Sequence, residues 1–315
     1  MEKRGDIAYL KLAREIIEHG NLRDTRNGLT YSIFGKTLEY DLGNNSIPLL
    51  TTKCMAFKSI KAELLWMLKG QTDSKLLEKD GVNIWKDNSS KEWIEKNNLT
   101  YRTGFSSGGE YVFNGDAYQE GDCGPVYGFQ WRNHGGLYQG CQRAGVDFFG
   151  CDQLKNVIYL INNDPMSRRM IMTALNPSQE NQMALPPCHM TYQFYVDIDE
   201  NTKEKYLSCK MDQRSADVFL GLPFNIASTA IMVNIIAKLT GCKPKRMIIT
   251  LGDAHVYKEH LDVMKEQLER ENDIKEAPKL NIKDRGQTRV EDFEICDFTL
   301  DGYNPHPSLK AKMIV

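Results

Sequence analysis

The spacing of apolar residues predicts alternating helices and strands along most of the chain. Residues 8–18, 59–68 and 146–161 have the three-to-four-residue spacing of a helix, and residues 257–270 predict a charged amphipathic helix. Residues 29–42 alternate between apolar and polar, with turn residues between, and predict the two strands of a hairpin. Further strands are predicted at residues 170–175, 190–196, 206–211 and 246–251, and a short extended segment at 309–315.

Residues 223–239 form the most apolar segment and predict a helix with apolar side chains on nearly every face. A helix of that kind is buried. Strands and helices mixed around a buried helix predict one α+β (mixed α/β) domain over residues 1–315. The chain has no Gly-x-Gly-x-x-Gly or Walker loop, which disfavours a Rossmann or P-loop enzyme.

Residues 96–124 show little periodicity and contain one turn signal after another, such as Ser106-Ser107-Gly108-Gly109 and Asn114-Gly115. They predict an inserted surface loop at about residues 96–121.

Composition narrows the class of protein. The chain has 315 residues, 41% of them hydrophobic and 26% charged, with a net charge of -2 and no basic block. This balance is typical of a globular protein and disfavours a general nucleic-acid or membrane-surface binder. The N-terminus leads into no apolar signal region, and residues 224–239 are expected to be too short and too polar to span a bilayer.

The eight cysteines are scattered along the chain without CxxC or zinc spacing. We therefore expect reduced thiols, a cytoplasmic location and no metal.

Cys188 is the strongest candidate for a nucleophile. It follows Pro186-Pro187 and opens a predicted strand. Its neighbour His189 should point to the opposite face of that strand, so it is a poor candidate for the base. A free thiol has a pKa of about 8.5 and needs a nearby cation to ionise at neutral pH; Arg214 is the leading candidate. A buried, inert cysteine beside a core histidine remains the alternative.

Two groups of polar residues suit an anion. Gln213, Arg214 and Ser215 stand at the end of a predicted strand and offer amide, guanidinium and hydroxyl donors for a phosphate. The alternative is strand-end hydrogen bonding with a salt bridge to a neighbouring aspartate. Arg168-Arg169 precedes another strand and is either a solvated edge or a second phosphate clamp.

Four more residues are candidates for a polar site. Asn225 lies in the first turn of the buried helix, where its amide can read an imide edge or cap the backbone. His255 and Tyr257 are two residues apart, so they can share a face and bind a hydroxyl, or merely each other. Glu63 lies in an apolar helix; its position favours a solvated edge over a functional pocket.

Nine motifs in order along the chain resemble the thymidylate synthase family, and together they are highly specific. They cover nearly the whole chain apart from the loop around 96–120. The matching runs are SIFG (32–35), PLLTTK (48–53), ELLW (63–66), GPVYGFQW (124–131), LPPCH (185–189), QRS (213–215), FLGLPFNIAS (219–228), LGDAHVY (251–257) and GYNPHP (302–307).

The resemblance implies a fold and a reaction. The fold would be a large mixed sheet flanked by helices around a central buried helix, in a homodimer formed by sheet packing. Deoxyuridylate (dUMP) would be methylated at C5 to thymidylate (dTMP), with 5,10-methylenetetrahydrofolate supplying both the carbon and a hydride. Cys188 would add to C6 of the pyrimidine, and Asn225 would bind N3–H and O4. Glu63 would manage proton transfers, supported by Tyr127 and His189.

The resemblance also implies two sets of binding residues. The dUMP site would comprise Arg26, Arg168, Arg169, Gln213, Arg214, Ser215, Asp217, Asn225, His255 and Tyr257. Of these, Arg168 and Arg169 would come from the other subunit, and His255 and Tyr257 would hold the ribose 3′-hydroxyl. The folate site would comprise Ile84, Trp85, Asn88, Asp217, Leu220, Gly221, Phe224, Met313 and Ile314, with Asp217 on the pterin and the C-terminal tail closing over the complex.

The chain departs from the family pattern at three places. Counting back from Ser32 puts Thr25 where the family has a loop arginine, so a one-residue shift is needed; Arg26 is favoured over Arg23. Leu175 stands in place of a frequent tryptophan, and the 96–121 loop is longer than usual.

Two other functions remain as alternatives. One is a deoxyuridylate hydroxymethylase, which adds water to the same intermediate. The other is a catalytically silent homologue that binds a nucleotide or RNA.

Overall fold

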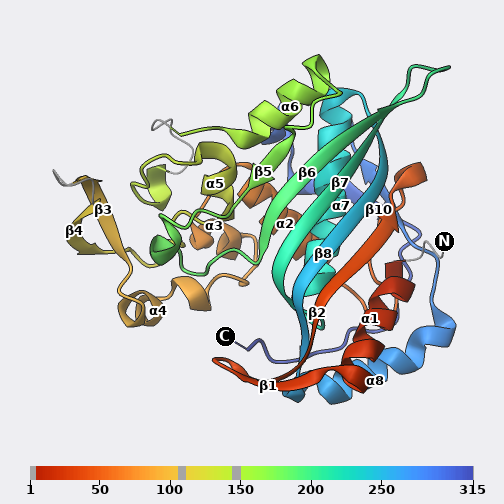
Figure 1. Ribbon diagram of the computed structural model, residues 1–315, viewed down its shortest axis with the longest axis horizontal. Helices are drawn as coiled ribbons and strands as arrows, with labels where there is room; N and C mark the ends of the chain where they lie inside the picture. Colours follow the sequence, from red (N-terminus) through yellow and green to blue (C-terminus); the bar gives the residue numbers. More distant parts are fainter. Residues whose placement is uncertain (1–4, 106–110, 144–149, 315) are drawn as a thin grey trace. The chain divides into compact units, whose positions relative to one another are not determined.

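The computed structural model describes residues 5–105, 111–143 and 150–314. The chain forms two compact units (Figure 1). Unit 1 comprises residues 1–60, 192–288 and 296–315, and unit 2 comprises residues 61–191 and 289–295.

Unit 1 is built on long strands. Its elements are α1 (Gly5–His19), β1 (Asn21–Thr25), β2 (Gly28–Asp41), most of β6 (His189–Ile198), β7 (Lys205–Asp217), α7 (Gly221–Thr240), β8 (Lys243–Tyr257), α8 (Leu261–Glu269), β9 (Lys279–Ile282) and β10 (Phe298–Asp301). The main sheet has the order β1-β2-β8-β7-β6-β5. Strands β2 and β8 are antiparallel whereas β7 and β8 are parallel, so the sheet is mixed, as predicted.

Residues 29–42 are one strand and not the predicted hairpin. The hairpin instead joins β1 to β2 through a turn at residues 26–27. Gly35 suggested a turn within 29–42, but it has a φ of 81° and stays in the strand with open space around its Cα.

The predicted central helix is confirmed as α7, which packs against β7 and β8 (Figure 1). Nearly all of its apolar residues are buried, and it ends at Gly241, whose φ of 64° is the left-handed conformation that suits a helix C-cap. By length and composition α7 could cross a membrane, contrary to expectation. However, 72% of its most apolar window is buried, as in the core helix of a globular unit.

Unit 2 is richer in short elements. It contains most of α2 (Phe57–Leu68), then α3 (Ser74–Lys79), α4 (Lys91–Lys96), β3 (Thr100–Phe105), β4 (Tyr111–Ala117), α5 (Tyr127–Asn133), α6 (Gln153–Asn163) and β5 (Ile171–Thr173).

Two segments of unit 2 differ from the sequence pattern. Helix α6 begins at Gln153, where the Asp152 side chain accepts a hydrogen bond from the Lys155 N–H; residues 146–149 of the predicted helix lie outside the described residues. The region predicted as a loop contains the two antiparallel strands β3 and β4. In unit 1, α8 likewise starts later than predicted, because β8 extends to Tyr257.

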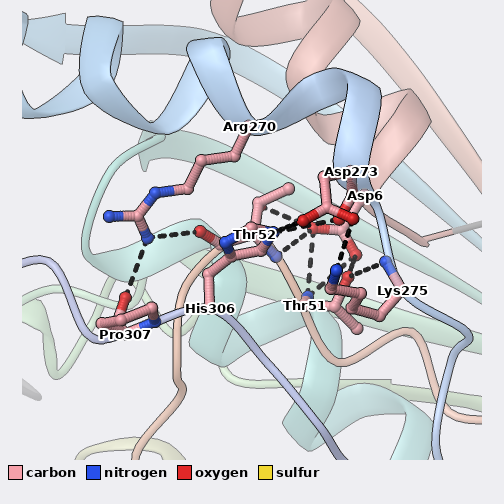
Figure 2. A network of polar contacts seen from close by, with 8 residues as sticks. All are labelled: Asp6, Thr51, Thr52, Arg270, Asp273, Lys275, His306 and Pro307. Atoms are coloured by element: carbon pink, nitrogen blue, oxygen red, sulfur yellow. Dashed lines mark hydrogen bonds and ion pairs between the residues drawn. The ribbon is translucent and has the colours of Figure 1, made fainter.

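A buried carboxylate fixes the N-terminal helix in unit 1 (Figure 2). Asp6, in the first turn of α1, accepts hydrogen bonds from the backbone N–H groups and the hydroxyls of Thr51 and Thr52, at 2.6–3.1 Å. Arg270 then donates to the Thr52 carbonyl and to the Pro307 carbonyl, both at 2.8 Å. The network therefore joins α1, the segment before α2 and the C-terminal segment.

We predict that Asp6→Ala lowers the free energy of unfolding by about 3 kcal/mol or more, because four buried donors lose their acceptor. Urea denaturation, with the slope checked for constancy, measures the change. Asp6→Asn, which keeps one carbonyl acceptor, should lose less. The exposed Glu200→Ala is the matched control and should change stability little; equal midpoints for Asp6→Ala and the control would contradict the prediction.

Candidate active site

Four residues of the predicted dUMP site meet at one cavity in unit 1. The cavity has a volume of about 180 Å³ and is lined by Thr25, Arg26, Asn27, Thr30, Ser215, Asp253, His255 and Tyr257. The strand register explains the grouping, since Ser215 pairs with Asp253 and Thr30 pairs with Tyr257 across adjacent strands. Guanidinium, hydroxyl and imidazole groups around one hollow suit a phosphate and a sugar hydroxyl.

Asp253 orients His255, a role that the sequence reasoning missed. The Asp253 Oδ1 lies 3.1 Å from His255 Nδ1 and accepts a hydrogen bond from the Ser32 hydroxyl at 2.8 Å. A carboxylate oxygen accepts, so Nδ1 carries the proton and Nε2 of the neutral ring is left as an acceptor. Asp253 and His255 alternate along β8, and this spacing was the available signal. The rings of His255 and Tyr257 also contact each other edge to face, with centroids 5.2 Å apart.

The two candidate loop arginines have different surroundings. Arg23 forms an ion pair with Asp253, whereas Arg26 lies in the β1–β2 turn and lines the cavity. Its Nε donates to the Asn27 side chain at 3.0 Å, and its side chain is exposed. The geometry therefore agrees with the choice of Arg26.

Three further predicted residues lie at or just before the start of α7: Gln213, Asp217 and Asn225. Gln213 donates to the Ser215 carbonyl at 2.8 Å and lies 3.5 Å from Asn225 Oδ1, so the Asn225 amide has a polar neighbour. Asp217 accepts hydrogen bonds from the next turn of backbone, at Phe219 N (3.0 Å) and Leu220 N (3.2 Å). The expected folate residues here are only partly buried, which leaves apolar surface available: Leu220, Gly221 and Phe224.

Lys53, from a distant segment of the chain, also contacts this turn, and the sequence pattern did not indicate this role. It is buried, donates to the Phe219 carbonyl and lies over the Phe219 ring at 3.7 Å from the centroid. Burial lowers the pKa of Lys53 to about 7, opposed by the charge of Asp217.

Unit 2 contains a continuous network from Glu63 to Cys188. Trp85 donates its indole N–H to Glu63 Oε1 at 2.8 Å, and the Trp85 and Tyr127 rings meet edge to face with centroids 6.1 Å apart. The Tyr127 hydroxyl accepts the backbone N–H of Cys188 at 2.7 Å. Tyr127 also stacks on His189, with centroids 4.1 Å apart. Five of the predicted residues are therefore in one chain of contacts.

Glu63 does not lie on a solvated edge of its helix, which its position in the sequence had favoured. Burial raises its pKa to about 7, and the hydrogen bond from Trp85 only partly offsets this. Helical spacing could not show this, because Trp85 is 22 residues away in the chain. A carboxyl group with a pKa near neutrality can both give and take a proton.

His189 is neutral, because burial lowers its pKa to about 3. Its ring contacts Tyr127 and Trp131, so it cannot serve as a cation beside the thiol. Cys188 is partly exposed, unlike Cys123, Cys141, Cys209 and Cys242, which are buried. Burial of those four thiols is typical of a structural role.

The remaining predicted residues differ in exposure. Arg168 and Arg169 are exposed in the turn before β5, and Arg214 is exposed on β7. Asn88 is buried, and its amide nitrogen has no hydrogen-bond partner among the described residues. Ile84 and Ile314 are partly exposed, and Met313 is 45% exposed. In the described parts of the chain, no group of three or more His, Cys, Asp or Glu residues could hold a metal ion.

Comparison with known proteins agrees with this arrangement. The thymidylate synthase family model matches residues 7–315. The chain belongs to the thymidylate synthase family. It is 45% identical to the thymidylate synthase of Agaricus bisporus over 309 residues, which cover 98% of each chain. It is 43% identical to that of Saccharomyces cerevisiae over 312 residues (98% of this chain, 96% of the relative) and to that of Homo sapiens over 312 residues (99% and 91%).

The match to the thymidylate synthase family covers the candidate site residues of both units. The cavity residues of unit 1 and the Glu63–Cys188 network of unit 2 all lie within residues 7–315. The sequence resemblance to this family is therefore confirmed, together with the large mixed sheet flanked by helices that it implied, whereas the homodimer stays a prediction.

We predict a pH-dependent stability difference between the protein and its Glu63→Gln variant. A raised folded-state pKa means that the native state binds the proton more tightly than the unfolded state does. This contribution is complete below about pH 4.5 and is lost as the pH rises through 7, amounting to up to about 3 kcal/mol. Glutamine cannot ionise, so the variant should gain in relative stability between pH 5 and 8.

Denaturant unfolding at several pH values measures this difference. Glu92→Gln, an exposed change on α4, is the control and should run parallel to the wild type. A Glu63→Gln curve that is also parallel to the wild type would exclude the raised pKa.

Proposed function

We propose that the protein is a thymidylate synthase that converts dUMP to dTMP with 5,10-methylenetetrahydrofolate as the donor of carbon and hydride. The match of the family model to residues 7–315 carries this proposal, because that range includes all of the candidate site residues. The relatives named above, from two fungi and human, are thymidylate synthases over nearly their whole lengths.

Cys188 is the nucleophile in this proposal. Its thiolate forms a bond from sulfur to C6 of the pyrimidine, and the electrons of the C5–C6 double bond move toward O4 as an enolate. Carbon 5 thereby becomes nucleophilic. The hydrogen bond that the Cys188 backbone N–H donates to the Tyr127 hydroxyl fixes the position of the thiol-bearing residue. Arg214 supplies the cation that favours the thiolate.

The cavity of unit 1 binds the phosphate and sugar of dUMP. Arg26 and Ser215 offer donors to the phosphate, together with Arg214 and Gln213. His255 and Tyr257 hold the ribose 3′-hydroxyl, and the Nε2 lone pair left by the Asp253 contact is suited to accept it.

Asn225 reads the pyrimidine. Its carboxamide offers an acceptor for N3–H and a donor for O4, and the donor stabilises charge that develops at O4 in the enolate. Gln213 limits the rotation of this side chain through its contact with Asn225 Oδ1.

Glu63 moves protons at O4 and C5, which a group with a pKa of about 7 can do at neutral pH. Tyr127 and neutral His189 support it without adding a charge to the network.

The cosubstrate supplies the one-carbon unit and the hydride when bound. Asn88 has a buried amide N–H without a partner among the described residues, which an acceptor on a ligand would satisfy. Partly exposed Ile84, Leu220 and Phe224 offer apolar contacts, Trp85 and Gly221 lie beside them in sequence, and Asp217 offers acceptors to the pterin. Met313 and Ile314 close over it from the C-terminal segment.

The proposal includes a homodimer that forms by face-to-face packing of the main sheets. Phe34 on β2 is 84% exposed and Tyr195 on β6 is 59% exposed, which is unusual for large apolar side chains on a sheet. In this dimer, Arg168 and Arg169 of each subunit reach the phosphate site of the other. The eight free cysteines support a cytoplasmic location.

We predict that Cys188→Ala lowers turnover by about four orders of magnitude or more, while dUMP still binds with an affinity within about threefold of the wild type. Release of tritium from C5-labelled dUMP and chromatography of dTMP measure turnover, and calorimetry measures binding. Cys296→Ala removes an exposed thiol and should leave turnover unchanged. Substantial turnover in Cys188→Ala would refute its role, and hydroxymethyl-dUMP from the wild type would refute the proposed reaction.

We predict that two inactive variants, Cys188→Ala and Arg169→Ala, complement each other when mixed. Half of randomly assembled dimers are mixed, and each mixed dimer has one complete site, so about one quarter of the wild-type activity should return. Mixing Cys188→Ala with Glu63→Gln is the control, because both residues belong to the same chain's site and no complete site can form. Equal activity in the two mixtures would contradict a shared phosphate site.

A further inference from the structure

His260 is a buried histidine that the proposed reaction does not use. It lies just before α8 with a side chain that is 1% exposed. Its Nε2 lies 2.9 Å from the backbone carbonyl oxygen of Lys312. A carbonyl oxygen only accepts, so Nε2 carries the proton and donates to the C-terminal segment.

This contact is the single hydrogen bond of the His260 ring among the described residues. Nδ1 is buried and lies 4.0 Å from Asp217 Oδ1, which is beyond hydrogen-bond distance. The ring also packs against Phe219 and Tyr257, with centroids 5.6 and 5.5 Å away. His260 therefore touches residues around the candidate site on one side and the tail on the other.

The C-terminal segment is otherwise anchored further back. Tyr303 donates to the Leu50 carbonyl at 2.9 Å, and the His306 N–H donates to the Thr51 carbonyl at 2.8 Å. Arg270 holds the Pro307 carbonyl at 2.8 Å. Among the described residues, no other hydrogen bond holds residues 308–314. The position of those residues consequently depends on His260.

We propose that His260 is a positioning residue that couples the last residues of the chain to the Asp217–Leu220 turn. This rests on the proposed function, in which Asp217 and Met313 contact the cosubstrate. The carbonyl of Lys312 is next to Met313. The hydrogen bond from His260 therefore sets the distance between Met313 and Asp217, the two residues that contact the cosubstrate in the proposed function. Loss of the hydrogen bond releases residues 308–314 and leaves the nucleotide cavity intact.

The test is a His260→Phe variant, which keeps a ring against Phe219 and Tyr257 but removes the donor to the tail. We expect the KM for 5,10-methylenetetrahydrofolate to rise about tenfold, the usual effect of losing one buried hydrogen bond. The Kd for dUMP should stay within about twofold. Trypsin should also cut after Lys310 or Lys312 faster than in the wild type when dUMP and an antifolate are bound, as followed by mass spectrometry.

Lys312→Ala is the matched control. It removes an exposed side chain but keeps the backbone carbonyl that His260 binds, so the KM for the cosubstrate should not change. His260→Gln can still donate to that carbonyl and should recover part of the lost affinity; His260→Leu, which also lacks the donor, replaces His260→Phe if that variant does not fold.

Three results would overturn the proposal. The first is a wild-type KM and wild-type tail protection in His260→Phe. The second is an equal loss of affinity for dUMP and cosubstrate with a lowered Tm, which indicates a merely structural histidine. The third is a His260→Gln variant as impaired as His260→Phe. Failure of the proposed function looks different, since the wild type itself would form no dTMP.

Discussion

The buried carboxylate of Asp6 is the contact on which the arrangement of unit 1 depends most. It takes four donors from Thr51 and Thr52, and so it fixes the segment that leads into Lys53. Lys53 in turn holds the Phe219 carbonyl just before α7 begins. The same threonines accept donors from Arg270 and the C-terminal segment (Figure 2). One carboxylate thereby links three distant parts of the chain to the start of α7.

The turn before α7 contains both residues that stabilise the fold and residues of the candidate site. The Asp217 side chain closes the turn by accepting two backbone N–H groups, and Lys53 and His260 pack on Phe219 from different segments. A turn held from several sides loses little entropy when a ligand binds, because its side chains are already ordered. Asn225, in the first turn of the helix that follows, inherits this rigidity.

Patterns that depend on local geometry were predictable from the sequence, and contacts between distant segments were not. The two-residue period of a strand placed His255 and Tyr257 on one face, where their rings contact each other. The solvated position predicted for Glu63 was wrong, because the environment of Glu63 is set by Trp85, which is remote in sequence. The hairpin predicted at residues 29–42 was wrong for a different reason. Gly35 tolerates a positive φ within a strand, so its presence does not require a turn. The contact of Asp253 with His255 follows from their two-residue spacing along β8, whereas its contact with Ser32 needed the register between β2 and β8, which apolar spacing does not specify.

The network around Tyr127 is built to hold protons and to avoid fixed charge. Burial favours the neutral form of Glu63 up to about pH 7 and keeps His189 neutral throughout the physiological range. Tyr127 lies between them and uses its hydroxyl to accept the Cys188 N–H. A second permanent charge here would shift the pKa of Glu63 away from neutrality, by Coulombic interaction in a poorly solvated region. A neutral histidine at this position therefore leaves the pKa of Glu63 near neutrality, where the carboxyl group can both give and take a proton.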